Sequence, residues 1–328
     1  MKFIEVIRKK NKLKVYFCGI KIFSRTKRIV DHEFEKKYAK RFDPDISIED
    51  KKYILTKQFE LSAGYTPSFD APKTFNEKLQ YIKLYYDNPL MSVCGDKYKV
   101  KDYIKNIIGE EYIVPTLAVW DKPDEIDFDK LPNEFVLKVN WGSGQNIIVR
   151  DKSKMDIDKI KEKLSKWLKP ESNHYFFSFE SGYKNIEPKI ICEKYVGELA
   201  ENLTCYKIFN FSSKPYLIQA VFDDKTKEET INYYDLDWNK LDLKQNFPNN
   251  DKNVSKPKNL AKMLELAEKL AAPFKYFVRV DFFEVGDKVI FSEFTFFSDN
   301  GMAAFTPDSW DNKLGDLIHL DITADKNI

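Results

Sequence analysis

The sequence predicts an α+β protein in which antiparallel hairpins are combined with separate amphipathic helices. Strand-like alternation over residues 206–221 and 277–294 is interrupted by short turns, which is typical of two hairpins. Apolar residues recur at helical spacing over residues 156–168 and 258–271. Neither GxGxxG nor GxxxxGK[ST] occurs, so the pattern does not indicate a Rossmann or P-loop fold.

The first half of the chain supplies further helices. Thr74 precedes Glu77 by three residues, and this capping-box spacing predicts that a helix begins there. Pro89 opens a second helix that we expect to continue through Ile104, because Pro is favoured in a first helical turn. A final helix is predicted after Pro307.

Short apolar runs between these helices predict the strands of another sheet. They are bounded by turn residues and rich in β-branched and aromatic side chains. The runs are residues 113–115, 135–139, 146–149 and 190–195.

Composition limits the class of protein and of chemistry. With 328 residues, 43% hydrophobic and 32% charged, the chain suits two or three packed lobes of a soluble protein. Its four cysteines lack CxxC spacing and are expected to be buried thiols in a reducing compartment. With three histidines, chemistry is expected to rest on Lys, Arg, Asp and Glu. No apolar run is long enough for a membrane span or a signal peptide, so we expect a cytoplasmic protein.

The N-terminus is strongly basic although the whole chain carries only +2. Residues 1–30 contain ten lysines and arginines and the single acidic residue Glu5, and residues 12–23 alternate as a hairpin turning at Cys18-Gly19. Such a segment can contact the anionic inner face of a membrane or an anionic polymer. A solvated basic hairpin explains the pattern equally well.

Lys138 lies inside an apolar strand, directly before a turn that contains Gly142, Ser143 and Gly144. Backbone N–H groups of a glycine-rich turn can approach phosphate oxygens, and the lysine and the serine hydroxyl add donors. The pattern is therefore a candidate triphosphate clamp. An ordinary hairpin turn beside an exposed lysine explains it as readily.

Arg279 and Asp281 project from one face of a predicted strand, and the hairpin brings Glu293 alongside. Two carboxylates in apolar strands are costly to bury without a partner. Mg²⁺ bound to nucleotide phosphates would satisfy them, and the arginine would stabilise charge on a transferring phosphoryl group. The alternative is a salt bridge on an exposed sheet face.

The strand end formed by residues 193–198 is the third candidate. Free backbone groups at a strand end can bind an adenine edge, and a carboxylate a few residues later can bind ribose hydroxyls. The residues concerned are Glu193, Lys194, Tyr195, Val196 and Glu198. A charged surface strand end is the commoner explanation of such a pattern.

The order of these three elements resembles that of the ATP-grasp superfamily. Finer matches are similar to the TupA-like ATP-grasp family of surface-polysaccharide and teichuronopeptide synthesis, over roughly residues 50–320. They are Phe75–Gln80, Asp96-Lys97-Tyr98, Leu131–Val149, Tyr206–Phe209 and Gly315–Ile318.

The resemblance implies two α+β lobes that clamp a nucleotide, after a basic extension. The implied division is residues 1–30 for the extension, 31–112 for a helical region, 113–200 for the nucleotide-clamp lobe and 201–322 for the metal and substrate lobe.

The resemblance also implies a role for each candidate residue. Lys138 would contact phosphates under the Gly142–Gly144 lid, and Lys207 would be a second phosphate contact. The backbone of Lys194–Val196 would bind adenine, and Glu198 the ribose. Arg279 would stabilise an acyl phosphate.

Metal binding is implied for Asp281 and Glu293, with Mg²⁺, or Mn²⁺ in its place. Relatives often carry Asn where Thr295 stands, so the hydroxyl of Thr295 and the nearby Asn300 are candidates for the remaining ligand. Relatives also often have His at Trp141, so the lid of this chain is expected to close differently.

The predicted function is an ATP-dependent carboxylate–amine ligase that forms an amide through an acyl phosphate. The resemblance implies a uronic acid of a capsular or cell-surface polysaccharide as the carboxylate and a small amine as the second substrate, with no nucleic acid partner. A sugar kinase and a non-catalytic scaffold of capsule assembly at the membrane are the alternatives. A kinase would show no amine-dependent turnover, and a scaffold would not need Lys138, Asp281 and Glu293 together.

Overall fold

The computed structural model describes residues 32–196, 204–224, 226–252 and 254–322, together with the backbone of three N-terminal strands. Those strands form an antiparallel sheet in the order β1-β2-β3. Their bounds are Ile4–Lys9, Lys12–Phe17 and Ile20–Arg25. The predicted pairing of two strands within residues 12–23 is confirmed by β2 and β3, and the predicted Cys18-Gly19 turn lies outside the described residues.

Helices account for most of the chain between residues 32 and 107, and four more α-helices follow in the described residues. The α-helices are α1 His32–Ala39, α2 Ile48–Ser62, α3 Phe75–Tyr85, α4 Pro89–Gly95, α5 Val100–Ile107, α6 Ile157–Trp167, α7 Tyr175–Ser178, α8 Leu260–Ala271 and α9 Ser309–Gly315. Short 3-10 turns are η1 Lys40–Phe42, η2 Glu110–Tyr112, η3 Pro123–Glu125, η4 Phe128–Lys130, η5 Lys152–Lys154, η6 Pro170–Ser172, η7 Ser181–Tyr183 and η9 Ser298–Gly301. Within the described residues, no helix is both long and apolar enough to cross a membrane.

A four-stranded antiparallel sheet forms the first half of the nucleotide-binding candidate region. Its order is β4-β7-β5-β6, with β4 Thr116–Trp120, β5 Phe135–Val139, β6 Asn146–Val149 and β7 Ile190–Lys194. Leu137 and Val139 are fully buried on one face, where they pack with Ile160 and Leu164 of α6. Lys138 therefore projects from the opposite face, since side chains alternate along a strand.

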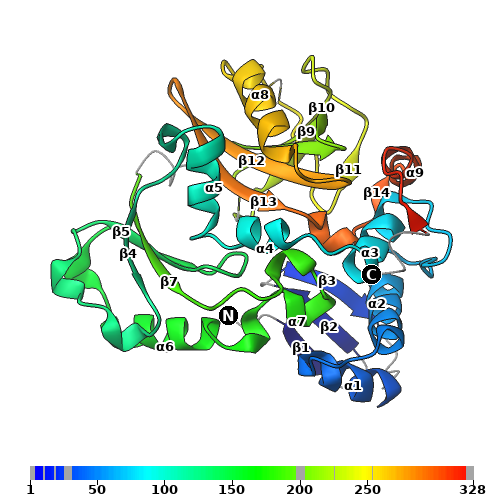
Figure 1. Ribbon diagram of the computed structural model, residues 1–328, viewed down its shortest axis with the longest axis horizontal. Helices are drawn as coiled ribbons and strands as arrows, with labels where there is room; N and C mark the ends of the chain where they lie inside the picture. Colours follow the sequence, from blue (N-terminus) through cyan, green and yellow to red (C-terminus); the bar gives the residue numbers. More distant parts are fainter. Residues whose placement is uncertain are drawn as a thin grey trace.

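A five-stranded antiparallel sheet forms the second half. Its order is β10-β9-β8-β12-β13, with β8 Cys205–Phe211, β9 Lys214–Phe222, β10 Thr230–Tyr234, β12 Phe277–Val285 and β13 Lys288–Thr295. A small sheet of β11 Lys244–Gln245 and β14 Phe305–Thr306 lies beside it. Figure 1 shows α8 over the five-stranded sheet and α6 along the four-stranded one.

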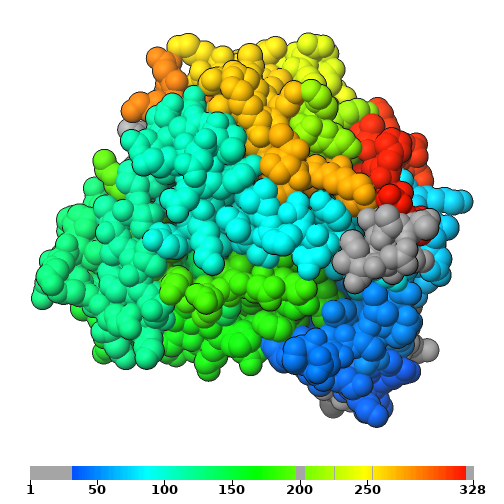
Figure 2. Space-filling view, in the orientation of Figure 1, coloured from blue at the N-terminus to red at the C-terminus, as the bar shows by residue number. Residues whose placement is uncertain are grey.

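The two faces of the five-stranded sheet have different partners. Glu284 of β12 accepts a hydrogen bond from the backbone of Asn259, at the start of α8, so the even-numbered side chains of β12 face that helix. The odd-numbered face meets α3, whose Phe75 ring lies 4.9 Å from the ring of Phe277. In Figure 2 the cyan surface around α4 and α5 crosses the middle of this view, between the green and the yellow-orange surfaces.

Most predicted elements are confirmed, and two boundaries differ for local reasons. The strand predicted at residues 113–115 instead begins at Thr116, because Pro115 has no N–H to donate to a sheet. The single helix predicted after Pro89 is two helices, broken at Asp96, whose carboxylate accepts from the backbone N–H groups of Tyr98 and Lys99. Three cysteines, Cys94, Cys192 and Cys205, are buried free thiols as predicted.

The capping box predicted at the start of α3 is present. The Thr74 hydroxyl accepts from the N–H of Glu77 at 3.2 Å, and the Glu77 carboxylate accepts from the N–H of Thr74 at 3.1 Å. This pair fixes the entry to the helix that carries Phe75 under the five-stranded sheet.

We predict that Thr74→Ala lowers the free energy of unfolding by about 1 kcal/mol, because it removes the cap acceptor. Thr74→Ser keeps the acceptor and is the matched control, with an expected loss below about 0.5 kcal/mol. Urea unfolding followed by circular dichroism measures both. Equal losses in the two variants would show that the cap does not stabilise this helix.

Candidate active site

Lys138 belongs to a group of three charges on the four-stranded sheet. The carboxylate of Glu193 on β7 bonds Lys138 through one oxygen, and its other oxygen lies 2.5 Å from the ammonium of Lys101 on α5. Lys101 also donates to the carbonyl of Val114 and to the hydroxyl of Thr116. One buried carboxylate thus holds two ammonium groups, which leaves this cluster with a net positive charge.

The charge state of Glu193 follows from its two partners. Burial alone would raise the pKa of its carboxyl, but the ammonium groups of Lys138 and Lys101 hold that pKa below its ordinary value. The carboxylate is therefore ionised at neutral pH and keeps both lysines in place.

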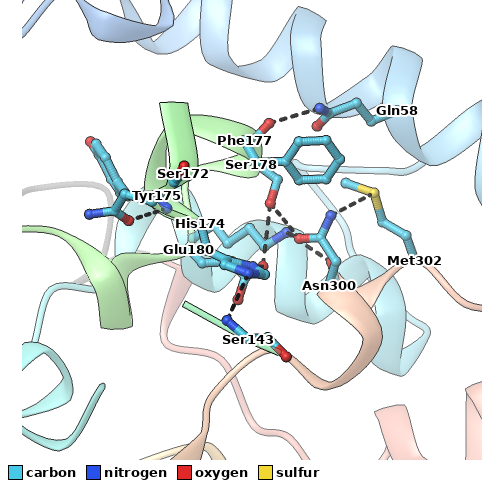
Figure 3. Close-up of polar contacts among 12 residues, drawn as sticks. Gln58, Ser143, Ser172, His174, Tyr175, Phe177, Ser178, Glu180, Asn300 and Met302 are labelled. Atoms are coloured by element: carbon cyan, nitrogen blue, oxygen red, sulfur yellow. Dashed lines mark hydrogen bonds and ion pairs between the residues drawn. The ribbon is translucent and has the colours of Figure 1, made fainter. Parts of the chain in front are cut away.

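The glycine-rich turn after Lys138 lies at the edge of this sheet. Ser143 and Gly144 are exposed at its apex, and Gly144 has a φ of +68°, a conformation that glycine adopts without strain. The N–H of Ser143 donates to Nε2 of His174 at 3.3 Å, and Figure 3 shows this contact at the lower end of a chain of polar side chains.

The strand end expected to bind adenine is only partly described. The N–H of Lys194 donates to the carbonyl of Pro115 at 3.0 Å, so this donor is used within the protein. Tyr195 and Val196 follow the end of β7 and are half-buried. Glu198, predicted to bind ribose, lies outside the described residues.

A row of polar side chains crosses the five-stranded sheet on the face opposite α8. The register places Asp281 opposite Glu293 on one side and opposite Lys207 on the other. Lys207 in turn lies opposite Gln219, and Gln219 opposite Tyr233. Polar residues thus occupy one position on all five strands of a sheet that is otherwise largely apolar.

Arg279 lies at the centre of this polar region and donates hydrogen bonds to several of its side chains. Its Nε and one terminal nitrogen donate to the two oxygens of Asp281, each at 2.8 Å, and its other contacts are the hydroxyls of Ser298 and Thr295. Glu293 lies 3.8 Å from the guanidinium. Burial disfavours the charge, but Asp281 outweighs this and raises the pKa of Arg279 above its ordinary value. Both residues are almost fully buried.

The predicted metal ligands divide between two places. Asp281 and Glu293 are adjacent across two strands, and Glu293 retains about a third of its side-chain exposure. The hydroxyl of Thr295 accepts from Arg279 at 2.9 Å. The side-chain oxygen of Asn300 accepts from Lys83 at 2.5 Å and from Ser178 at 2.6 Å, so both of its lone pairs are engaged within the chain.

The donors present fit a hard divalent cation that is shared with a phosphate-bearing ligand. Over the described ranges, no group of three or more His, Cys, Asp or Glu residues is placed to hold a metal. Two adjacent carboxylates are nevertheless the usual protein contribution to a Mg²⁺ site that nucleotide phosphates complete. Asp281 and Glu293 are adjacent carboxylates, but both oxygens of Asp281 already accept from Arg279 and its side chain is 1% exposed, so a bound cation would share them with the guanidinium.

Several residues of the site were not predicted from the sequence. Lys101 and Ser298 touch the predicted charges directly, while Lys83 and His174 hold the surrounding loops. Lys101 is one of two lysines in α5, and nothing in its local pattern distinguishes it from Lys105. The contacts depend on residues that are far apart in the sequence.

Comparison with known proteins places the chain in a family. The family model described as TupA-like ATP-grasp matches residues 77–319. The chain belongs to the TupA-like ATP-grasp family. This membership confirms the family that the motifs resemble and, with the two antiparallel sheets, the predicted α+β ATP-grasp fold.

Solved structures provide further likenesses. D-alanine–D-alanine ligase from Bacillus anthracis complexed with ATP is 16% identical, with 90% of this chain and 93% of that chain covered and a TM-score of 0.46. A second structure of that enzyme is 18% identical, with 77% and 76% covered and a TM-score of 0.44. N5-carboxyaminoimidazole synthase from Aspergillus clavatus, in complex with ADP and 5-aminoimidazole ribonucleotide, is 15% identical, with 63% and 45% covered and a TM-score of 0.36. Among curated proteins no sequence matches the chain.

We predict that Glu193→Gln destabilises the protein by about 3 kcal/mol at neutral pH, because two ammonium groups lose their shared partner. Since the folded-state pKa of Glu193 is depressed, its contribution is fully present above about pH 4.5, the unfolded value, and is lost as pH falls through the folded pKa. Stability measured against pH should therefore be flatter in the variant in this acid range. The exposed Glu187→Gln is the control, and equal curves for both variants would contradict the assignment.

Proposed function

We propose that this TupA-like protein joins a carboxylate to an amine, with ATP consumed through an acyl phosphate. The observation that carries the proposal is the buried Arg279–Asp281 pair in the polar row beside Lys207 and Glu293. Membership of an ATP-grasp family supports the use of ATP. The position of Arg279, beside two acids and among hydroxyls, suits an oxyanion or phosphoryl group that gains negative charge during the reaction.

In the first step an oxygen of the substrate carboxylate attacks the γ-phosphorus of ATP. The bond from that phosphorus to the bridging oxygen breaks, and ADP leaves. Lys138 and the Gly142–Gly144 turn would hold the phosphates, and Lys207 would contact the transferring group. Asp281 and Glu293 would hold Mg²⁺, or Mn²⁺ in its place, which supplies charge neutralisation on the phosphates when bound.

In the second step the amine nitrogen attacks the carbonyl carbon of the acyl phosphate. The carbon–oxygen bond to phosphate breaks, phosphate leaves, and the nitrogen gives up its proton as the amide forms. Arg279 would stabilise the negative charge on the oxygen in the transition state. Holding the two reactants together and excluding water are the remaining tasks of the chain, because water would hydrolyse the intermediate.

The proposed carboxylate is a uronic acid, such as glucuronate, of a capsular or cell-surface polysaccharide, and the proposed partner is a small amine. The support for both substrates is the resemblance to the TupA-like family, because that resemblance implies a role in surface-polysaccharide synthesis. The basic residues 1–30 support a cytoplasmic enzyme that contacts the inner face of the membrane or the capsule machinery.

An ADP-release assay with Mg-ATP, crossed over uronic acids and small amines, tests this function. We expect ADP release to require both a carboxylate and an amine, with one free phosphate for each ADP. Release that needs only a sugar, with the phosphate retained on that sugar, would instead identify a kinase. If no pairing of a carboxylate with an amine leads to ADP release, the ligase proposal is wrong, and the result is consistent with a scaffold.

We predict that Asp281→Asn folds but loses ligase turnover by at least about a hundredfold, because a metal ligand and the partner of Arg279 are both weakened. Asp287→Asn is the matched control, since Asp287 lies exposed in the β12–β13 turn and pairs with Lys258. Rates per folded molecule, with folding checked by circular dichroism, decide the result. Full turnover by Asp281→Asn would remove Asp281 from the site.

A further inference from the structure

The glycine-rich turn is anchored to the segment between α6 and α7. Its residues 141–145 make three side-chain or backbone hydrogen bonds to residues 167–174. The bonds run from Trp141 Nε1 to the Trp167 carbonyl at 2.9 Å, from the Ser143 N–H to His174 Nε2 at 3.3 Å, and from Gln145 Nε2 to the Ser172 carbonyl at 3.2 Å. Two acceptors are backbone carbonyls, which do not titrate. The third, at the apex of the turn, is an imidazole.

We propose that His174 is a positioning residue that holds the apex of the turn in the conformation that binds nucleotide phosphates. This proposal rests on the proposed use of ATP at this turn. Nε2 of His174 accepts the hydrogen bond from the Ser143 N–H. Within the described part of the chain, the Gly144 N–H and the Ser143 hydroxyl have no hydrogen-bond partner, and both residues are exposed. Both groups are therefore available as donors to phosphate oxygens.

His174 is itself held in place by buried groups. Its Nδ1 lies 3.8 Å from a carboxylate oxygen of Glu180, and its ring packs against Tyr183 with the centroids 5.1 Å apart. His174 and Glu180 are both more than nine-tenths buried. Such confinement fixes the direction of Nε2 toward the turn, as Figure 3 shows.

The support for His174 continues into the lobe that carries the metal candidates. The hydroxyl oxygen of Ser178 lies 3.5 Å from a carboxylate oxygen of Glu180. The same hydroxyl donates a hydrogen bond to the side-chain oxygen of Asn300 at 2.6 Å. Lys83 of α3 donates to the same oxygen. Asn300 lies in η9, whose Ser298 contacts Arg279. The position of the phosphate-binding turn is thereby tied, through His174, to the loop that follows β13.

The bond from Ser143 requires one protonation state of the imidazole. Nε2 accepts only when it carries no proton, so the neutral tautomer has its proton on Nδ1, on the side of Glu180. A second proton removes the acceptor and leaves the Ser143 N–H without a partner.

Other charged groups near His174 must be separated from this effect. Glu180 faces its Nδ1, and Tyr183 stays neutral because burial raises the pKa of its hydroxyl. Burial also lowers the pKa of Lys83 to about 7, although Glu180 opposes this change. A comparison of variants at position 174, made at one fixed pH, therefore tests the imidazole.

The test measures binding of Mg-ADP by calorimetry and hydrogen exchange of the Ser143 amide in the full chain. The variants are His174→Leu, which has no acceptor, and His174→Gln, which has an acceptor that does not titrate. His319→Leu is the control because His319 is exposed and distant in sequence. We expect His174→Leu to raise the Kd of Mg-ADP about threefold to tenfold, the equivalent of one hydrogen bond, and His174→Gln to restore most of the affinity.

The two variants separate positioning from mere stability. At one fixed pH, the Ser143 amide should lose protection against exchange in His174→Leu and keep most of it in His174→Gln. Unchanged Kd and unchanged exchange in His174→Leu would overturn the proposal. Exchange is also measured without nucleotide, so it tests the hold of His174 on the turn even if Mg-ADP does not bind. Loss of amine-dependent turnover with these effects intact would refute only the proposed ligase reaction.

Discussion

The buried pair of Arg279 and Asp281 is the constraint on which the site depends. An isolated charge in the centre of a sheet is prohibitively costly, so each residue must be satisfied by the other and by further polar groups. The guanidinium is placed between Asp281 and the hydroxyls of Ser298 and Thr295, and this fixes the end of β13 and the turn of η9. Because these polar groups satisfy one another, the largely apolar sheet can contain a row of polar side chains.

In the second cluster the central buried charge is a carboxylate instead of a guanidinium, and it too is satisfied by groups of opposite charge. Glu193 is held ionised by Lys138 and Lys101, so one carboxylate brings a strand and a helix together beside the glycine-rich turn. The two clusters belong to different sheets, and each provides positive groups that suit polyphosphate. His174, Ser178 and Asn300 connect the turn of one sheet to the loop of the other. The proposed phosphate-binding turn and the proposed metal carboxylates would therefore be linked by polar contacts.

Two separate sheets suit the proposed reaction, which would pass through an unstable acyl phosphate. The nucleotide must be held while the carboxylate and then the amine reach the same atom, and water must be kept away. Rigid strands carry Lys138, Lys207 and Asp281, whereas the Gly142–Gly144 turn is an exposed loop. This division places the charged contacts on strands and leaves the exposed residues Ser143 and Gly144 on the turn.

The sequence by itself determined the fold class, the main hairpins, the α3 capping box and the family, because each rests on local periodicity, turn chemistry or a motif in fixed order. It also identified Arg279, Asp281 and Glu293 as neighbours, since strand alternation and a short hairpin bring them together. Only the tertiary structure decided that Lys101 shares Glu193 with Lys138, that Asn300 is bound by Lys83 and Ser178, and that His174 meets the glycine-rich turn. These contacts join residues tens to hundreds of positions apart, and packing of whole elements, which no local pattern records, sets their geometry.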